Sequence, residues 1–238
     1  MTDTKSFAER VALVTGASRG IGAATAEALA AGGAHVILTA RTASGLEQVE
    51  ENIHAAGGSA TIAPLDLTAR ENITKLAAAV AERWGRLEIL VLNAAMLGSL
   101  SPVEHLDAKE LAKLFATNVF ANQALIAAFD PLLRRAERAE IIGITSSVGS
   151  EPRAFWGGYG ASKAAFENLL AAYADETAHA GRIRVQIIDP GATRTRMRQN
   201  AFPGEEPASL KPPEAVAAAI VERLLGDGPT GSRGRVEA

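Results

Sequence analysis

The sequence predicts an α/β fold in which a doubly wound parallel sheet of about seven strands is flanked by helices. Short apolar runs rich in β-branched residues alternate along the chain with longer helical stretches, as in strands joined by crossover helices. The chain has 238 residues and is 47% hydrophobic, which suits one well-filled core and is short for two. Because no linker or compositional break divides it, we expect one domain over residues 1–238.

The first predicted strand is the apolar run at 10–15, and the glycine-rich segment after it becomes strongly helical. Further strands are expected at 34–40, 60–64, 87–93, 140–145 and 184–188. Further helices are expected at about 44–56, 70–84, 109–135 and 159–180. Short strands that are apolar on both faces imply parallel pairing, with helices covering both sides of the sheet.

Composition argues against several classes of function. The net charge of -3 and the pI near 5.9 disfavour a nucleic-acid-binding face. The chain has no cysteine and its histidines are scattered, so we expect no metal site at His35, His54, His105 or His179. No apolar run reaches the roughly 18 residues that cross a membrane, and the first ten residues are too polar for a signal peptide. We therefore expect a soluble, cytoplasmic protein.

A glycine-rich turn, Thr15 to Gly22, lies where the first strand meets the first helix. Gly16, Gly20 and Gly22 give it the spacing G-x-x-x-G-x-G, and glycine lets the backbone come close to a ligand. The following helix presents free N–H groups and the positive end of its dipole, which suit a pyrophosphate. We interpret the turn as a dinucleotide site; a glycine turn without a ligand is the alternative.

Tyr159 and Lys163 form a second feature, because residues four apart lie on one face of a helix. An ammonium beside a phenol favours the phenolate, so Lys163 is expected to lower the pKa of Tyr159 from its usual value of about 10. Ser146 follows the strand predicted at 140–145 and lies 13 residues before Tyr159. Taken alone, the spacing Tyr-x-x-x-Lys also fits a surface lysine beside a half-buried tyrosine.

The turn TGASRGIG, followed at about two thirds of the chain by Tyr159-x-x-x-Lys163, resembles the short-chain dehydrogenase/reductase (SDR) family of the classical, single-domain type. The resemblance covers about residues 8 to 225. It implies a Rossmann-type fold, a nicotinamide dinucleotide cofactor and a homodimer or homotetramer. It also implies an oxidoreductase that transfers a hydride between the nicotinamide and a carbonyl or secondary alcohol substrate.

The charge at the end of the second strand indicates which nicotinamide cofactor fits. An acidic residue there would bind a ribose 2′-hydroxyl, whereas a 2′-phosphate is attracted to arginine. Ala40 and Arg41 stand at this position, and Arg19 lies in the glycine turn. We therefore expect NADP(H) to be preferred over NAD(H); two solvated arginines are the alternative.

The resemblance assigns further cofactor contacts. Asp66 and Leu67 are expected at the adenine, although Asp66 could instead cap the next helix with Thr68. In place of the family's Asn-Asn-Ala-Gly, residues 92–95 read LNAA, which we interpret as an adjusted cofactor wall. The full expected cofactor set is Gly16, Ser18, Arg19, Gly20, Ile21, Gly22, Arg41, Asp66, Leu67, Asn93, Ala94, Ala95, Tyr159, Lys163, Pro190, Gly191, Thr193 and Thr195.

The segment after the sixth strand resembles the family's PG-x-x-x-T, which binds the nicotinamide carboxamide. This assigns Gly191 and Thr195, with Thr193 as the alternative to Thr195. Residues 194–211 are rich in proline, glycine and charge, and are expected to form a mobile lid over the substrate. Three arginines in this lid either meet an anionic substrate group or form a solvated face: Arg194, Arg196 and Arg198.

Catalytic roles also follow from the resemblance, for Asn118, Ser146, Tyr159 and Lys163. Ser146 would donate a hydrogen bond to the substrate oxygen, and Tyr159 would deliver the proton. Lys163 would hold the nicotinamide ribose, while Asn118, in a locally distorted helix, would connect Lys163 to solvent through water. Ser147 is the alternative to Ser146, but the 13-residue spacing favours Ser146.

The identity of the substrate is not readable from the sequence. Residues expected near the cleft by position are Met96, Leu97, Ser147, Val148, Phe155 and Trp156, of which the last two also fit a subunit interface. The C-terminus resembles the family's final strand at about 230–237 but stops early, so fraying is expected there. Two other functions are weighed: a catalytically weak, NADPH-binding regulatory protein, and a relative that performs epimerisation or dehydration. The intact catalytic set favours the oxidoreductase.

Overall fold

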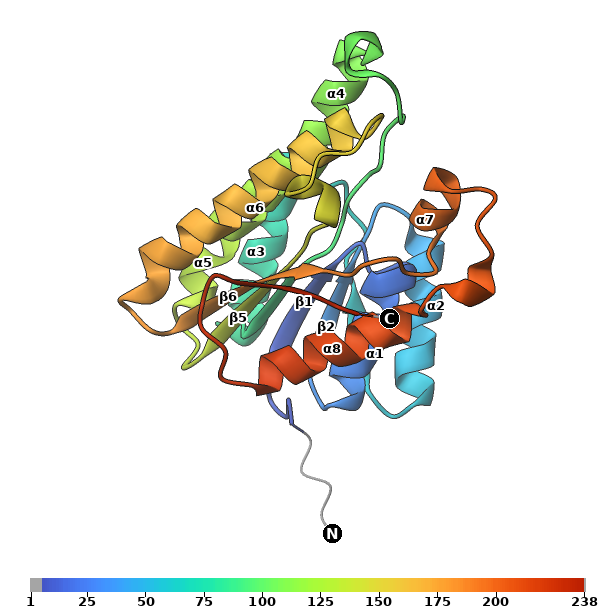
Figure 1. Ribbon diagram of the computed structural model, residues 1–238. Coiled ribbons are helices and arrows are strands. Elements are labelled where there is room, and N and C mark those ends of the chain that lie inside the picture. Colours follow the sequence, from blue (N-terminus) through green and yellow to red (C-terminus); the bar gives the residue numbers. More distant parts are fainter. Residues whose placement is uncertain (1–5, 238) are drawn as a thin grey trace.

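The computed structural model describes residues 6–237. The first five of the ten N-terminal residues that we expect to be too polar for a signal peptide lie outside this range. A seven-stranded sheet with the order β3-β2-β1-β4-β5-β6-β7 forms the centre of the molecule (Figure 1). All six neighbouring pairs are parallel, which confirms the predicted doubly wound fold. The strands are β1 (Val11–Thr15), β2 (His35–Thr39), β3 (Ser59–Ile62), β4 (Ile89–Leu92), β5 (Ala139–Ile144), β6 (Ile183–Asp189) and β7 (Ser232–Arg235).

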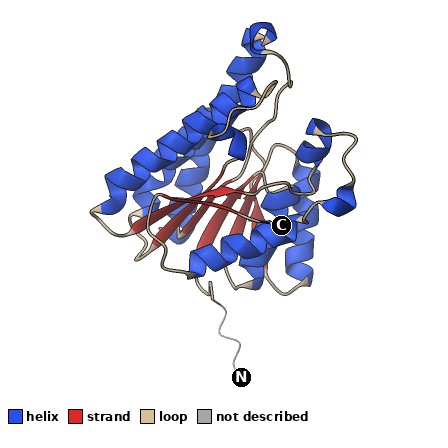
Figure 2. Ribbon diagram, in the orientation of Figure 1, coloured by secondary structure: helices blue, strands red, loops and turns tan. Residues whose placement is uncertain are grey.

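Helices cover both faces of the sheet (Figure 2). One face carries α1 (Gly20–Ala31), α2 (Ala43–Ala55) and α8 (Pro213–Leu225), and the other carries α3 (Arg70–Trp84), α5 (Ala121–Leu133) and α6 (Gly157–Ala178). Each face therefore has its own apolar core, with alternate strand residues pointing into one or the other. The strand order reverses between β1 and β4, and the carboxyl ends of these strands are where such folds bind ligands.

The helix predicted at 109–135 is interrupted. It consists of α4 (Ala108–Phe115), a π-helical turn η2 (Ala116–Phe120) and α5, so the local distortion expected around Asn118 is present. The short helix α7 (Arg196–Ala201) and the longer α8 were not expected from the sequence. Among the described residues, none of the helices combines the length and apolar character needed to cross a membrane.

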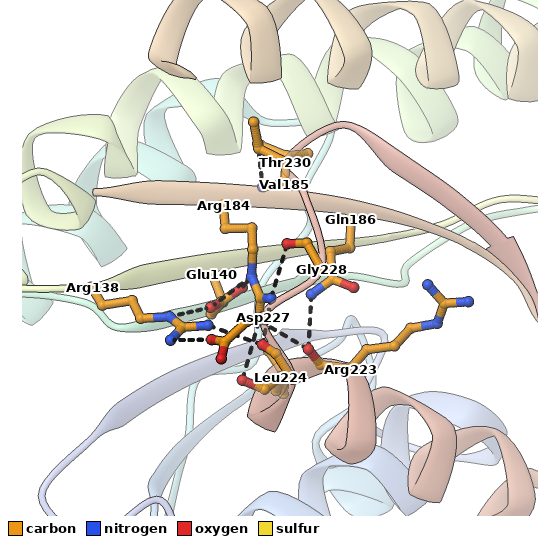
Figure 3. A network of polar contacts seen from close by, with 11 residues as sticks. Arg138, Glu140, Arg184, Val185, Gln186, Arg223, Leu224, Asp227, Gly228 and Thr230 are labelled. Carbon is orange, nitrogen blue, oxygen red and sulfur yellow. Dashed lines mark hydrogen bonds and ion pairs between the residues drawn. The ribbon is translucent and has the colours of Figure 1, made fainter. Parts of the chain in front are cut away.

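The C-terminal strand β7 is paired with β6 at four positions, in contrast to the expected fraying. A buried polar network beneath it explains why (Figure 3). The Arg184 guanidinium pairs with the buried carboxylate of Glu140 at 2.8 Å, and it also donates to main-chain carbonyls at the C-terminal end of α8 and in the loop that follows. A cation at a helix C-terminus meets the negative end of the helix dipole. Thr230 accepts a hydrogen bond from the Val185 N–H at 3.0 Å, so the loop before β7 is held against β6.

Candidate active site

The glycine turn adopts the conformation that its sequence predicts. Gly16 and Gly20 have positive φ angles of 66° and 58°, which favour glycine. A Cβ atom placed on Gly22 would lie 2.3 Å from the carbonyl oxygen of Gly16, so only glycine fits there. Helix α1 begins at Gly20, and no side chain caps its first N–H groups. These free donors and the open backbone fit a pyrophosphate.

Asn93 supports this turn from the end of β4. Its carboxamide donates to the carbonyl oxygens of Thr15 and Gly16 at 2.9 and 3.3 Å. The Thr15 hydroxyl accepts from the main-chain N–H groups of Asn93 and Ala94 at 2.9 and 3.1 Å. The expected cofactor wall therefore borders the glycine turn, and the Asn93 side chain braces the turn.

The two arginines expected to bind a 2′-phosphate are both exposed. Neither Arg19 nor Arg41 makes a side-chain hydrogen bond or ion pair with another residue between 6 and 237. Hydrogen bonds from Thr68, with a smaller effect from the Arg41 charge, hold the pKa of Asp66 below its usual value. Helix α3 has no side-chain cap, so Asp66 forms a turn with Thr68 and does not cap the helix.

Tyr159 and Lys163 lie on a helix that packs against the segment carrying Ser146, at the carboxyl end of β5. Tyr159 and Lys163 lie on α6 and are only 7% and 2% exposed. The Lys163 ammonium donates to the carbonyl oxygen of Ile144, two residues before Ser146, at 2.8 Å, and lies 5.7 Å from the centroid of the Tyr159 ring. A Cβ on Gly160 would lie 2.7 Å from the carbonyl oxygen of Val148, so α6 packs closely on the turn that follows Ser146.

Burial controls the pKa values of this pair. It raises the pKa of the Tyr159 phenol, and the carboxylate of Asp189 adds to the increase. Burial also lowers the pKa of Lys163 to about 8, against the opposing charge of Glu167. The pKa of Tyr159 thus changes in the direction opposite to the one expected from the Tyr-x-x-x-Lys spacing. The reason is that removal of water disfavours the phenolate, which one neighbouring ammonium does not overcome.

Asn118 is fully buried in the π-helical turn η2. Its carboxamide accepts from the N–H of Met96 and donates to the carbonyl oxygen of the same residue, both at 2.9 Å. It also donates to the Ser162 hydroxyl at 3.0 Å, and Ser162 precedes Lys163 on α6. Asn118 therefore joins the segment after β4 to α6, the helix that carries Tyr159 and Lys163. The water connection between Asn118 and Lys163 stays a prediction.

The two threonines after β6, Thr193 and Thr195, make different contacts. The buried Thr193 donates its hydroxyl to the Pro190 carbonyl oxygen at 3.1 Å and thus closes its own loop. Thr195 caps α7 by accepting from Arg198, and its methyl group would lie 3.5 Å from a Cβ on Gly20. Thr195 therefore borders the glycine turn, as expected of a cofactor contact. The positive φ of 63° at Gly191 explains the glycine in this loop.

The segment expected to form a lid, 194–211, contacts Tyr159 through one residue. The Met197 sulfur lies 3.9 Å from the Tyr159 hydroxyl. The Phe202 ring stacks on Trp156 with centroids 5.6 Å apart. Of the three arginines in this segment, Arg198 pairs with Glu205 and lies over Phe202, whereas Arg194 and Arg196 are exposed. The charge of Arg198 is therefore paired within the segment itself.

A hollow of about 190 Å³ reaches Tyr159 from the side of α4. Only Leu97 among the expected cleft residues lines it, because the segment before α4 and the first turns of that helix form most of the wall. The other lining residues are Gly98, Ser99, Ser101, His105, Leu106, Asp107, Glu110, Leu111, Leu114, Gly158 and Tyr159. Phe155 lies outside the hollow, and its ring is 57% exposed at a positive φ of 70°. The assignment of Leu106, Leu111 and Leu114 needed the packing of α4 against α6.

Residues 10–206 match the model of the family described as short chain dehydrogenase. An uncharacterised oxidoreductase of Escherichia coli K12, YciK, is 39% identical over 222 residues, which are 92% of this chain and 87% of the relative. The chain belongs to the short-chain dehydrogenase family. The solved structure of YciK has a TM-score of 0.93 at 36% identity, covering 100% of this chain and 99% of that chain. A metagenomic short-chain oxidoreductase in complex with NADP has a TM-score of 0.84 at 33% identity, covering 98% and 99%.

In this short-chain dehydrogenase, the sequence pattern did not indicate three residues around Tyr159. Asp189 ends β6 and raises the pKa of Tyr159, while Met197 contacts Tyr159 and Phe202 stacks on Trp156. No periodic pattern in the sequence marks these three residues, because each acts on a segment that is distant along the chain. The apolar character of Met197 and Phe202 in an otherwise charged stretch is the one sign that this segment packs on something.

Proposed function

We propose that this protein is an NADP(H)-dependent oxidoreductase that transfers a hydride between the nicotinamide and a carbonyl or secondary alcohol substrate. The observation that carries the proposal is the convergence of Tyr159 and Lys163 with the segment that bears Ser146 at the end of β5. The lid connects this group to the glycine turn, because Thr195 borders Gly20 and Met197 contacts Tyr159. Family membership and a relative in complex with NADP support the cofactor.

NADPH, when bound, would supply the hydride that adds to the carbonyl carbon of the substrate. Ser146 donates a hydrogen bond to the carbonyl oxygen as negative charge develops there. Tyr159 transfers its phenolic proton to that oxygen, and the raised pKa keeps the phenol protonated until transfer. The Lys163 ammonium then stabilises the phenolate that remains. In alcohol oxidation the same groups act in reverse.

The test is NADPH oxidation by the purified protein against ketones, aldehydes, quinones and 3-oxoacyl thioesters. Turnover of any one carbonyl class supports the proposal. Tight NADPH binding without turnover of any of them would favour the alternative, a regulatory protein that binds NADPH. The intact catalytic residues argue for the enzyme.

Replacement of Arg41 by alanine is expected to raise the KM for NADPH by about tenfold or more and to leave the KM for NADH unchanged. The reason is that a hydrogen bond between charged groups contributes about 1.5–3 kcal/mol, and only NADPH carries the 2′-phosphate. Steady-state kinetics with both cofactors measure this. The control is Arg135→Ala, an exposed arginine that contacts the carbonyl oxygen of Gly85. Equal use of NADH and NADPH by the wild type, with no effect of the substitution, would contradict the assignment.

The kcat/KM for NADPH is expected to fall as the pH rises above about 8. Burial lowers the pKa of Lys163 in the free protein to about 8, so the ammonium loses its proton above that pH. The neutral amine has no positive charge to stabilise the Tyr159 phenolate, and kcat/KM reports groups of the free enzyme. A pH profile from 6 to about 10 measures the effect. A flat profile to the alkaline end would show that the charge of Lys163 is not needed.

A further inference from the structure

Glu167 lies one turn after Lys163 on α6, and the mechanism above does not use it. Its carboxylate accepts a hydrogen bond from the hydroxyl of Thr145, the residue before Ser146. Its second oxygen pairs with the Nε of Arg233 on β7 at 3.1 Å. Arg233 in turn donates to the Ser150 hydroxyl at 2.9 Å. Glu167 therefore contacts both the end of β5 and the C-terminal strand.

The turn after Ser146 also packs directly on this carboxylate. A Cβ on Gly149 would lie 2.8 Å from Glu167 Oε1 and 3.2 Å from backbone atoms of α6. Gly149 itself donates its N–H to the Ser146 carbonyl oxygen at 3.0 Å. The segment on each side of Ser146 therefore lies against Glu167: the Thr145 hydroxyl before it and the turn at Gly149 after it.

We propose that Glu167 is a positioning residue of the active site, which fixes the segment that carries Ser146 and joins it to α6 and β7. This inference rests on the proposed function, because Ser146 has its catalytic role there. The buried network of Arg184 and Glu140 holds the loop before β7, so Arg233 is presented from an anchored strand. The C-terminal strand thereby contributes to the geometry of the site through Glu167, which is 66 residues from Arg233 along the chain.

The charge of Glu167 also acts on Lys163. Lys163 lies near the rings of Tyr159 and Phe166 on α6 and donates to the Ile144 carbonyl oxygen on β5. The charged groups around it are Glu167, the Asp189 carboxylate that acts on Tyr159, and Arg233 of β7, which pairs with Glu167. Glu167 is the carboxylate whose charge opposes the lowering of the Lys163 pKa by burial. A neutral side chain at this position therefore makes the ammonium less stable.

The experiment compares three variants of the full-length protein. Glu167→Gln keeps the size and an acceptor for Thr145 but removes the charge. Thr145→Val removes the hydroxyl and keeps the charge. Asp175→Asn, an exposed carboxylate on the same helix, is the matched control. Two quantities are measured: kcat with the KM for NADPH, and the titration of Lys163 by NMR of ¹³C-labelled lysine without substrate. Lys163→Met identifies the lysine signal.

We expect Thr145→Val and Glu167→Gln each to lower kcat by about tenfold, with the KM for NADPH within about twofold of the wild type, because small displacements of a catalytic group slow the chemical step. Glu167→Gln is also expected to shift the Lys163 titration down by about half a pH unit or more. Thr145→Val leaves that titration unchanged. If Glu167→Gln does not fold, Arg233→Gln takes its place, and removal of this cation should shift the titration upward.

An unchanged Lys163 titration in the charge variant, or a kcat within about twofold of the wild type in both variants, would overturn the proposal. Failure of the proposed function is a different result, namely a wild type that turns over no carbonyl substrate. The lysine titration needs no turnover, so in that case it alone decides whether Glu167 acts on Lys163.

Discussion

Replacement of Tyr159 by phenylalanine is expected to lower kcat for carbonyl reduction by about 10²–10⁴-fold, the usual contribution of a general acid. The substitution removes only the hydroxyl that transfers the proton, whereas the proposed role of Ser146 is to donate a hydrogen bond and not to transfer a proton. Two further donors of the candidate site have other partners. Lys163 donates to the Ile144 carbonyl oxygen, and Asn118 is engaged with Met96 and Ser162. NADPH affinity should stay within about threefold, because the phenol is one of many cofactor contacts in the proposed site.

The same substitution should leave stability almost unchanged. The one hydrogen-bond partner of the hydroxyl among the described residues is the Met197 sulfur at 3.9 Å, a weak acceptor. The matched control is Tyr173→Phe, because the Tyr173 hydroxyl donates to Asp130 at 2.6 Å, far along α6 from the site. This control should keep full activity and lose about 1–2 kcal/mol of stability. Full activity in Tyr159→Phe, measured with NADPH and the best carbonyl substrate, would remove the basis of the proposed mechanism.

Replacement of Gly22 by alanine is expected to weaken NADPH binding by at least about tenfold and to lower the free energy of unfolding by about 1–3 kcal/mol. Alanine in place of glycine usually stabilises a helix by about 1 kcal/mol, but here the clash should dominate. The new Cβ would lie 2.3 Å from the Gly16 carbonyl oxygen and 2.5 Å from the Asn93 amide nitrogen. The first of these is a backbone atom, so relief requires movement of the turn itself.

Two measurements test the Gly22→Ala prediction: fluorescence titration with NADPH measures the affinity, and thermal denaturation measures the stability. Gly228→Ala is the matched control, because an added Cβ there meets no atom within 4 Å. The control should bind NADPH as the wild type does and should melt at the same temperature. Wild-type affinity in Gly22→Ala would show that the turn adapts without cost and that its glycine spacing has no part in cofactor binding.

The sequence predicted most of the fold because its signal is local. Each strand is an apolar run and most of the following helices have their own periodicity, so the succession of elements along the chain and their parallel pairing could be inferred. The order of the strands within the sheet came from the structure. Two helices were not predicted. The short α7 lies in a proline- and glycine-rich region that has no clear periodicity. In α8, by contrast, Val216, Ile220 and Leu224 recur at helical spacing between Pro213 and Gly226, and this signal was overlooked. The π-helical turn at Asn118 was expected from the family resemblance and not from periodicity.

In the candidate site, too, local features were predicted from the sequence and long-range contacts were not. Gly16, Gly20 and Gly22 were identified from the sequence because their backbone conformations and close approach allow only glycine. Contacts between segments that are distant along the chain were not predicted from the sequence. The contact of Met197 with Tyr159 and the pairing of Glu167 with Arg233 join residues 38 and 66 positions apart. No pattern within one helix or strand reports such contacts.

By itself, the sequence determined where the strands, the glycine turn and the Tyr159–Lys163 pair lie along the chain, because spacing and residue type are enough to decide these. The tertiary structure decided the protonation of that pair. Spacing alone indicates that Lys163 lowers the pKa of Tyr159, but burial raises the pKa of Tyr159 and lowers that of Lys163. Loss of hydration disfavours every charged group in the site. The size of the resulting pKa shift depends on how segment 194–211, α6 and β5 pack together.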